Sequence, residues 1–437
     1  MASHHHPRPI RTAARLAVAV LLASTVFGRG PSECRWRSRA CCLRAAPREG
    51  ATTMEYFRAA DAVRDASKSA TGRTATRLDT ASKAGEARFD GKMLNAAHAA
   101  IDGGEWVIDV AKRKVPPNGT CVAAYELTLR LRPCGGGEST GAVVIGPASP
   151  DRDCFDARGW RSSGPEDARL LALPAHPDVG ARFWLVYADF VPRVGAPGGY
   201  SKHMFGAVVS STGRAGSRNT FSNLEVQAPK PLDWADGSSP WSAQEKNWSP
   251  FLSKGQTYVH QWLAEPFTGS TVALEVDASS SRISKRHVCP GSGARLRRIL
   301  KVDDGTAVAG GTNGLALNAS HSIAVGHTFI EAPNALRMYA QFAYLFSSAA
   351  PFCIVAATRR FHLSVATTTV SRLTADFAPL PTTAHTAPHV GNAAIQFPTS
   401  LVAVDGGALQ LAWGRGDRAS HLSTLDAKWI VQQMALT

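Results

Sequence analysis

The chain lacks the short motifs that mark several large classes of enzyme. It contains no Gly-x-Ser-x-Gly nucleophile motif, no phosphate loop of the Gly-Lys-Ser type and no His-Glu-x-x-His zinc motif. Its eight cysteines include no Cys-x-x-Cys pair, which argues against a structural zinc site. An Asp-x-Asp occurs at residues 151–153, but it lies in a loop rich in Pro and Gly, and we expect it to be solvated. The sequence therefore predicts no bound metal and no resident cofactor.

The sequence also lacks a concentrated patch of one charge. Its formal net charge is +14, but residues 1–50 hold nine Arg and two Glu, so half of the excess lies there. A nucleic-acid-binding protein gathers basic side chains on one element, with aromatic residues between them. Only residues 284–287 and 295–301 come close, and we interpret both as solvated loop or edge-strand charge. The sequence therefore predicts no nucleic-acid partner.

The apolar run near the N-terminus is too short to span a membrane comfortably. LAVAVLLASTVFG has 13 residues and follows Arg8, Arg11 and Arg15, whereas a spanning helix needs about 20 residues. Basic residues before a short apolar stretch are typical of a signal peptide, which we assign to residues 1–28. The alternatives are a short buried helix and an uncleaved signal anchor, which would attach the chain to a membrane. The segment predicts the secretory pathway, with the protein in the ER or Golgi lumen or secreted.

An oxidising compartment gives the cysteines a structural meaning. We expect Cys121 and Cys134, which a short connection separates, to form a disulfide. Glycosylation sequons begin at Asn118, Asn247 and Asn318, so the sequence predicts a glycoprotein. Asn247 is the poorest acceptor of the three, because a proline follows its sequon.

Glycine and proline are abundant where charge is scarce. The chain has 38 Gly, 26 Pro and only 19% charged residues, which indicates many turns and favours an all-β fold. Residues 29–90 are first basic and then Ala-rich, with few large apolar side chains, and we predict a partly disordered stem and a helical or frayed stalk. Short apolar alternations fill the rest, so we assign residues 91–437 to one β domain.

A repeat runs through that domain. Each copy has a polar or small cluster, a short apolar strand, a turn of Gly, Asp or Asn, and a second strand. The copies begin at Asn95, Pro165, Glu245, Gly310 and Ile395, at spacings of about 65 to 85 residues. Units too small to bury their own faces must stack on one another, and many short antiparallel strands per unit suit propeller blades. Five units predict a five-bladed β-propeller.

The third copy, EKNWSPFLSKGQTYVHQW, opens with polar residues where a strand is about to enter a core. Such groups are costly to bury unless each has a partner. In a propeller the first residues of every innermost strand converge on the centre, where a ligand pocket needs polar groups. The equivalent segments are residues 166–169, 245–247 and 311–313. We therefore expect these three segments to meet.

Five motifs in this order resemble the blades of a family of five-bladed propellers that act on β-mannosides. The motifs are GPEDARLL, EKNWSPF, GGTNGLAL, YAQFAYLFSSAAPF and IQFPTSLVAVDGGALQLAWGRGDRAS. The family comprises β-mannoside phosphorylases and β-1,2-mannosyltransferases, and the resemblance covers most of residues 92–425. It implies an enzyme that acts on β-linked, mannose-type carbohydrate.

The resemblance also assigns roles to individual residues. Asp167 matches the aspartate of the family's Glu-Asp-Pro-Arg segment, which implies that it is the catalytic carboxylate, although Ala168 stands in place of proline. One carboxylate that takes or gives a proton suits an inverting sugar transfer. The following residues are candidates for binding donor and sugar: Glu166, Arg169, Lys246, Asn247, Trp248, Thr312, His327, Tyr344 and Asp417.

The third segment illustrates the alternatives to a substrate-binding role. The ammonium of Lys246 and the amide of Asn247 suit phosphate oxygens or sugar hydroxyls, and the ring of Trp248 suits a pyranose face. Lys246 could instead pair with Glu245, and Trp248 could pack between blades.

We predict an inverting glycosyltransferase that uses a nucleotide sugar, because phosphorolysis usually serves sugar salvage rather than a lumenal pathway. A phosphorylase using a sugar phosphate and a hydrolase pairing Asp167 with Glu245 or Asp417 are alternatives. A non-catalytic carbohydrate-binding propeller is the third. The expected partner is a carbohydrate in every case.

Overall fold

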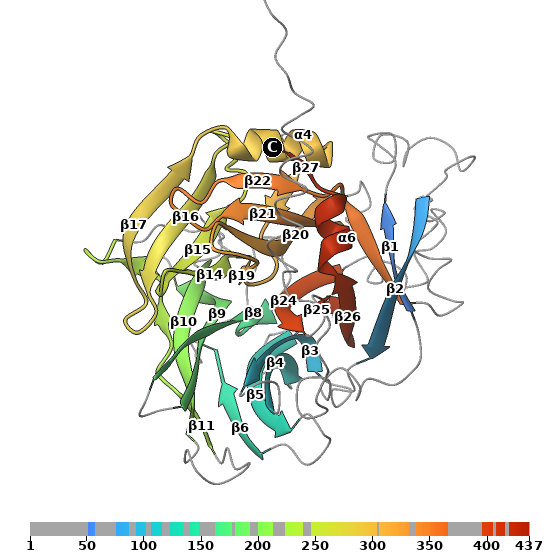
Figure 1. Ribbon diagram of the computed structural model, residues 1–437. Coiled ribbons are helices and arrows are strands. Elements are labelled where there is room, and N and C mark those ends of the chain that lie inside the picture. The colour runs from blue at the N-terminus through green and yellow to red at the C-terminus, as the bar shows by residue number, and fades with distance from the viewer. Residues whose placement is uncertain are drawn as a thin grey trace, which may run out of the picture.

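The computed structural model is built almost entirely of β-sheet, which confirms the predicted all-β class (Figure 1). It describes residues 51–56, 76–86, 93–101, 106–115, 123–133, 140–147, 162–176, 180–192, 200–212, 223–238, 246–303, 306–331, 337–365, 396–404, 408–415 and 419–436.

The first two predicted repeats each form a five-stranded sheet. The first sheet has the order β3-β4-β5-β6, and β7 pairs with β5. Its strands are β3 (Met93–Ile101), β4 (Trp106–Val115), β5 (Ala123–Pro133), β6 (Thr140–Ile145) and β7 (Ser162–Ser163). The second has the order β11-β10-β9-β8, and β12 pairs with β10. Its strands are β8 (Glu166–His176), β9 (Gly180–Pro192), β10 (Tyr200–Thr212), β11 (Asn223–Val226) and β12 (Lys230–Pro231).

The third predicted repeat is a sheet of order β13-β17-β16-β15-β14, followed by a helix. Its elements are β13 (Asp233–Trp234), β14 (Ser249–Ser253), β15 (Gln256–Trp262), β16 (Thr271–Asp277), β17 (Arg282–Cys289) and α4 (Ser292–Leu300).

The last two predicted repeats lie in one twelve-stranded sheet. The fourth contributes β18 (Ala307–Ala309), β19 (Leu315–Ala316), β20 (His321–Glu331), β21 (Arg337–Ser347), β22 (Ile354–Ala357) and β23 (Phe361–Val365). The fifth contributes β24 (Gln396–Val404), β25 (Ala408–Arg415), β26 (Ala419–Asp426), α6 (Ala427–Gln432) and β27 (Ala435–Leu436), which pairs with β22.

Two strands near the N-terminus join these two repeats. β1 (Ala51–Tyr56) pairs with β23, β2 (Thr76–Glu86) pairs with β26, and the two pair with each other. The expected helical or frayed stalk is therefore wrong for these residues. Hydrogen bonding to the edges of two strands that are distant in the sequence gives these residues their strand conformation.

The strand groups follow one another around the molecule in chain order (Figure 1). The first strands β3, β8, β14 and β24 lie toward the middle, and β8 contacts each of the other three. The residues at the start of β8 are thus brought against several repeats at once.

Four apolar clusters fill the spaces between successive repeats. The first cluster lies between repeats one and two, and the others lie between two and three, three and four, and four and five. On β8, Leu170 belongs to the first of these and Leu171 to the second. Both faces of such a strand are buried, which explains why the sequence shows continuous apolar runs there rather than strict alternation. Each repeat therefore depends on its neighbours for burial, as the stacking argument requires.

A disulfide between Cys289 and Cys353 links the third repeat to the fourth, with Cα atoms 5.4 Å apart. No local pattern predicts this pair, because the two cysteines are 64 residues apart in the chain. The expected pair, Cys121 and Cys134, lies outside the described residues.

The N-terminal apolar run and the whole of residues 1–50 also lie outside the described residues. Among the residues that are described, no helix is both long and apolar enough to cross a bilayer. The division into signal segment, stem and propeller domain stays a prediction.

Candidate functional site

The three polar segments that begin successive repeats meet, as predicted. The Nε of Arg169 donates to the carbonyl oxygen of Gly311 at 2.6 Å, and its Nη2 donates to Oδ1 of Asn247 at 3.3 Å. The backbone N–H of Gly311 donates in turn to Oγ of Ser249 at 3.2 Å. We call Asp167, Arg169, Lys246, Asn247, Gly311 and His327 the central polar cluster.

Arg169 is the hub of this cluster and is completely buried. Its Nη1 donates to the carbonyl oxygen of Asp167, and its guanidinium carbon lies 4.7 Å from the centre of the Phe397 ring. Burial lowers the pKa of Arg169 to about 10, and the nearby Asp167 opposes that shift. The side chain therefore remains cationic at neutral pH while it holds parts of the second, third, fourth and fifth repeats together.

Two residues of the cluster have an unusual backbone. Asp167 has φ 58° and Asn247 has φ 66°, both in the left-handed region. Asp and Asn are the non-glycine residues that adopt this region most readily. The register of β8 against β9 also shifts between Glu166 and Arg169, which marks a bulge at Asp167. Bulges and left-handed residues re-aim side chains and gather at functional sites.

Ala168, which stands where the family has proline, lies in the apolar core. Ala168 is 1% exposed and packs in the apolar cluster between the first two repeats. It therefore lies on the core side of the bulge, where an apolar side chain is accommodated.

Two glycines allow the strands to approach closely. A Cβ on Gly310 would lie 2.5 Å from the carbonyl oxygen of Asn247. A Cβ on Gly311 would lie 2.5 Å from Cγ of Pro398 and 2.5 Å from the carbonyl oxygen of Val325. Only residues without a Cβ permit this contact between backbones.

His327 lies on β20 and is completely buried. Its ring is 5.4 Å from that of Tyr339 and 5.1 Å from that of Phe397. Burial holds its pKa well below the usual value, and the positive charges of Arg169 and Lys246 lower it further. The imidazole is therefore neutral. Neither ring nitrogen makes a hydrogen bond of normal geometry with a described residue. The backbone of Gly310 nevertheless interacts with the ring.

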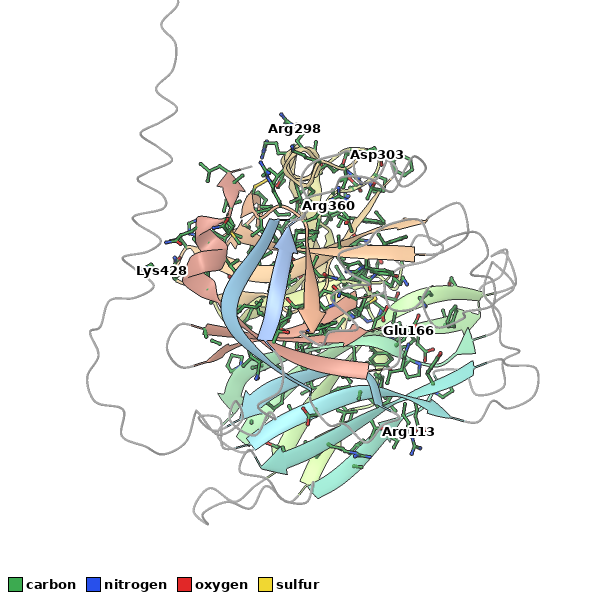
Figure 2. All side chains as sticks on the ribbon, turned by 90° about the vertical axis from the view of Figure 1, so that its right-hand side faces the viewer. Arg113, Glu166, Arg298, Asp303, Arg360 and Lys428 are labelled. Carbon is green, nitrogen blue, oxygen red and sulfur yellow. A yellow bond between two sulfur atoms is a disulfide. The ribbon has the colours of Figure 1, made fainter. Side chains whose placement is uncertain are left out.

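Glu166 is engaged by two lysines that the sequence analysis missed. Lys202 on β10 forms an ion pair with Oε1, and Lys112 on β4 lies 3.8 Å from Oε2 (Figure 2 labels Glu166). Both lysine side chains are largely buried. The only sequence signal was a lysine inside each strand, which does not reveal a shared partner.

Thr312 is committed to the backbone. Its hydroxyl donates to the carbonyl oxygen of Asn313 at 2.9 Å and accepts from the N–H of Val325 at 3.0 Å. The amide of Asn313 makes two hydrogen bonds with the backbone of Leu401 in the fifth repeat, at 3.0 and 2.9 Å. These residues stabilise the junction of repeats, and the substrate-binding role expected of Thr312 stays a prediction.

Two aromatic candidates belong to the core. Trp248 is completely buried in the cluster between the second and third repeats, which agrees with packing between repeats, the alternative stated above. Tyr344 is completely buried in the next cluster, where burial raises the pKa of its hydroxyl beside Ser249. The substrate-binding roles expected of both rings stay predictions.

Lys246 is half-buried and close enough to His327 to affect its pKa. No ion pair of Lys246 occurs with a described residue. Its alternative partner, Glu245, lies outside the described residues, as does the candidate Asp417. Asn247 is 4% exposed and bonded to Arg169, so the folded chain has no room for a glycan there.

Gln341 is a polar residue that the sequence analysis missed. It lies opposite His327 in the β20–β21 register and is completely buried. Its Nε2 donates to the carbonyl oxygen of Gln396 at 2.8 Å, while its Oε1 accepts no hydrogen bond from a described residue. A glutamine inside the apolar run MYAQFAYLF was the available signal.

The cluster thus combines one carboxylate, two cations, a neutral imidazole and an amide at a junction of repeats. Buried charges interact more strongly than charges in water. Such a set can move a proton and hold a negatively charged group. Within the ranges that the structure describes, no group of three His, Cys, Asp or Glu side chains is placed to hold a metal ion.

Solved structures similar to this chain include enzymes whose names refer to mannose compounds. One is β-1,2-mannobiose phosphorylase from Listeria innocua, at 11% identity and a TM-score of 0.43, covering 79% of this chain and 94% of that one. A second is MPT-4, a mannose phosphorylase from Leishmania mexicana, at 12% identity and a TM-score of 0.42, covering 80% and 89%. A third is MPT-1, a GDP-Man-dependent mannosyltransferase from Leishmania mexicana, at 11% identity and a TM-score of 0.42, covering 78% and 86%.

These proteins are of the kinds whose blades the five motifs resemble. No model of a protein family and no curated protein sequence matches the chain.

Proposed function

We propose that this chain is an inverting glycosyltransferase for β-linked, mannose-type carbohydrate, built on a five-bladed propeller and using a nucleotide-sugar donor. The observation that carries the proposal is the setting of Asp167. It is a buried carboxylate at a bulge, in a left-handed backbone conformation, beside a guanidinium that bonds to two other repeats. The same residue matches the catalytic aspartate of the family that the motifs resemble.

The arrangement of the strands supports the propeller. Five successive groups surround the middle of the molecule, and apolar clusters lie between consecutive groups. In a propeller, the first strand of each blade lies nearest the axis, which agrees with the contacts of β8.

Asp167 would serve as the base for the attacking hydroxyl. The acceptor oxygen forms a bond to the anomeric carbon of mannose, the bond from that carbon to the donor phosphate breaks, and the hydroxyl proton moves to Asp167. Attack from the face opposite the leaving group inverts the anomeric carbon. A single carboxylate is sufficient, because the phosphate leaves as a stable anion.

The other cluster residues would hold the donor. Lys246 supplies a positive charge for phosphate oxygens, and the fixed charge of Arg169 adds to the local potential. Neutral His327 can donate one hydrogen bond and accept another, which suits a hydroxyl. Arg169 would act mainly by position, because its three donor nitrogens already have partners within the protein.

Phosphorolysis of β-mannosides is the second candidate, because it needs the same single carboxylate and the same cations. Hydrolysis requires a second carboxylate to activate water. The carboxylates considered for that task, Glu245 and Asp417, lie outside the described residues, and Glu166 is already bound by two lysines. A binding propeller without catalysis is the remaining alternative.

The proposed compartment is the lumen of the secretory pathway or the cell exterior. The Cys289–Cys353 disulfide supports it, because such bonds persist in oxidising compartments.

A transfer assay on the full chain tests the function. The full chain is required, because β1 and β2 take part in the twelve-stranded sheet. GDP-mannose and mannose 1-phosphate are offered with short mannoside acceptors, and we expect elongation with GDP-mannose. Asp167→Asn should lower the rate roughly 10²–10⁴-fold, whereas Asp303→Asn, at an exposed position, should leave it unchanged.

The assay separates the candidates. Elongation with mannose 1-phosphate alone would assign a phosphorylase. Mannoside binding without turnover, retained in Asp167→Asn, would assign a binding protein. Full activity of Asp167→Asn would contradict the proposed mechanism.

A further inference from the structure

One of the three glycosylation sequons lies on a surface turn. Asn318, Ala319 and Ser320 connect β19 to β20, and Ala319 and Ser320 are exposed. The middle residue is not proline, as the motif requires, and no proline follows the sequon. The sequon at Asn247 lies in the central polar cluster, and the one at Asn118 lies outside the described residues.

The side chain of Asn318 is held through its oxygen. Its Oδ1 accepts the backbone N–H of Ser320 at 2.8 Å and that of His321 at 2.9 Å. No hydrogen bond joins its Nδ2 to a residue that the structure describes. The backbone N–H groups of Leu317 and Asn318 both donate to the carbonyl oxygen of His321, at 3.0 and 3.2 Å. The turn therefore fixes the amide group and leaves its nitrogen without a partner in the described parts of the chain.

The hydroxyl of Ser320, which the motif also requires, is similarly available. The carbonyl oxygen of Ser320 accepts the N–H of Ser348 at 2.8 Å. Its Oγ makes no hydrogen bond with any of the described residues. Both side chains that define the sequon thus keep their reactive or recognised group unused by the fold.

The neighbouring turn leaves room for a bulky group. This turn comprises residues 347–351, and its last three residues, two alanines and a proline, are exposed. The hydroxyls of Ser322 and Ser348 lie 3.1 Å apart, and Ser348 also bonds to Ser320, so the two turns are side by side. Neither turn has a charged or a large side chain at an exposed position.

The turn at Asn318 lies at the far end of its strand from the central polar cluster. β20 begins at His321, and His327 lies six residues further along it. An extended chain of that length spans about 20 Å. A group attached at the turn therefore does not occupy the space between the residues of the cluster.

We propose that Asn318 carries an N-linked glycan, attached in the lumen of the secretory pathway. Its Nδ2 loses a proton to a base of the host's oligosaccharide transferase and bonds to the anomeric carbon of the oligosaccharide. The bond from that carbon to a lipid diphosphate breaks, and the lipid diphosphate leaves as an anion. The glycan rests on the proposed compartment, but not on the sugar transfer proposed for this chain.

Burial distinguishes the two sequons that the structure describes. A glycan is bulky and solvated, so a folded chain accommodates it at the surface. Asn247 is 4% exposed and its Oδ1 is bonded to Arg169, so a glycan there is incompatible with the fold. At Asn318 the same modification breaks no hydrogen bond of Nδ2 with a described residue.

Translation of the full chain in the presence of microsomes from the endoplasmic reticulum tests the site. Resistance to added protease reports entry into the lumen, and a shift in mobility after treatment with peptide-N-glycosidase reports an attached glycan. Release in heavy-oxygen water followed by mass spectrometry identifies the asparagine that carried it. We expect a protected chain with the label at Asn318.

Conservative variants separate the chemistry from the structure of the turn. Asn318→Asp keeps the accepting oxygen but removes the amide nitrogen, so the glycan should be lost. Ser320→Ala should lose it too, whereas Ser320→Thr, which keeps the hydroxyl, should retain it. Ser249→Ala destroys the sequon of Asn247 and should leave the parental shift unchanged.

Two results would overturn the glycan alone. One is a protected chain in which Asn318 is unlabelled, and the other is a parental shift that persists in both Asn318→Asp and Ser320→Ala. A chain that stays accessible to the protease would overturn the proposed compartment together with the glycan. The transfer assay with GDP-mannose is read separately, so the proposed function stands or fails independently of these results.

Discussion

At the scale of single residues, Arg169 has the most demanding position in the molecule. A buried cation is tolerated only when partners replace its water. Here Gly311, Asn247 and the backbone of Asp167 supply hydrogen bonds, and Phe397 covers the planar face. A guanidinium can serve these directions together, whereas an ammonium cannot.

Replacing Arg169 with lysine should therefore destabilise the fold, although the charge is kept. We expect a loss of about 2–3 kcal/mol, because at least two hydrogen bonds and the contact with Phe397 are lost and polar groups remain buried without partners. Urea unfolding followed by fluorescence measures the change.

Arg298→Lys is the matched control for this prediction. Arg298 is exposed on α4, so its replacement should change stability by no more than about 0.5 kcal/mol. Equal effects of the two variants would show that Arg169 does not act as a hub.

The sequence predicted part of the site at this scale. Asp167, Arg169 and Asn247 were found because each stands in a short motif at the start of a repeat, and repeats place equivalent residues together. Trp248 and Tyr344 lie in apolar clusters between repeats. Their motifs did not reveal this packing, because a motif does not show on which side of a strand a ring lies. Lys112, Lys202 and Gln341 were missed, because their partners come from other strands or repeats.

At the scale of elements, the junction of the fourth and fifth repeats depends on backbone contact. Gly311 lies against Pro398 and Val325 with no room for a methyl group. Gly311→Ala should destabilise the protein by roughly 1–3 kcal/mol, because the strands must separate to accept the Cβ. Gly146→Ala is the control, since nothing lies within 4 Å of a Cβ there. Thermal unfolding of the two variants would show whether the close approach of the chain at Gly311, rather than the loss of a glycine itself, causes the loss of stability.

The disulfide between Cys289 and Cys353 joins the third and fourth repeats. It closes a loop of 64 residues, and in the chain-entropy description such a loop contributes about 4 kcal/mol. The variant with alanine at both positions should lose stability of this order. The stability of this variant should not depend on a reducing agent, whereas the parent should become less stable when its disulfide is reduced. A parent that is unaffected by reduction would refute the prediction.

Strand groups were predictable at this scale and their connections were not. Alternating apolar residues and turn signals located four strand groups and most of the fifth. The strands β1 and β2 were not predicted, because they carry few large apolar side chains and their pairing with β23 and β26 is non-local. The cysteine pairing failed for the same reason, since its 64-residue separation leaves no local signal.

At the scale of the whole molecule, acid should weaken the fold through a buried histidine. His260 is 1% exposed, and its ring lies 4.7 Å from that of Phe251 and 4.6 Å from that of Phe346. Burial lowers its pKa from 6.5 to about 4. Between these two values the unfolded chain binds a proton that the folded chain does not, so stability falls as the pH decreases.

We expect His260 to contribute a loss of about 3 kcal/mol between pH 6.5 and 4 and no further change below that range. His327, also buried and neutral, acts in the same direction. Urea unfolding at a series of pH values measures the slope. His260→Phe should reduce the slope in this window, and an unchanged slope would show that another group is responsible.

The twelve-stranded sheet has a consequence for the order in which the chain assembles. β1 is synthesised early, yet Thr52 pairs with Val365, and Ala84 of β2 pairs with Ser423. The ribosome must release nearly the whole chain before either strand can find its outer neighbour. Such distant pairings form slowly, and unpaired edges remain exposed in the meantime. The joining of the first strands to the last repeats should therefore be the final step of folding, and the interval before it is when the protein is most open to aggregation.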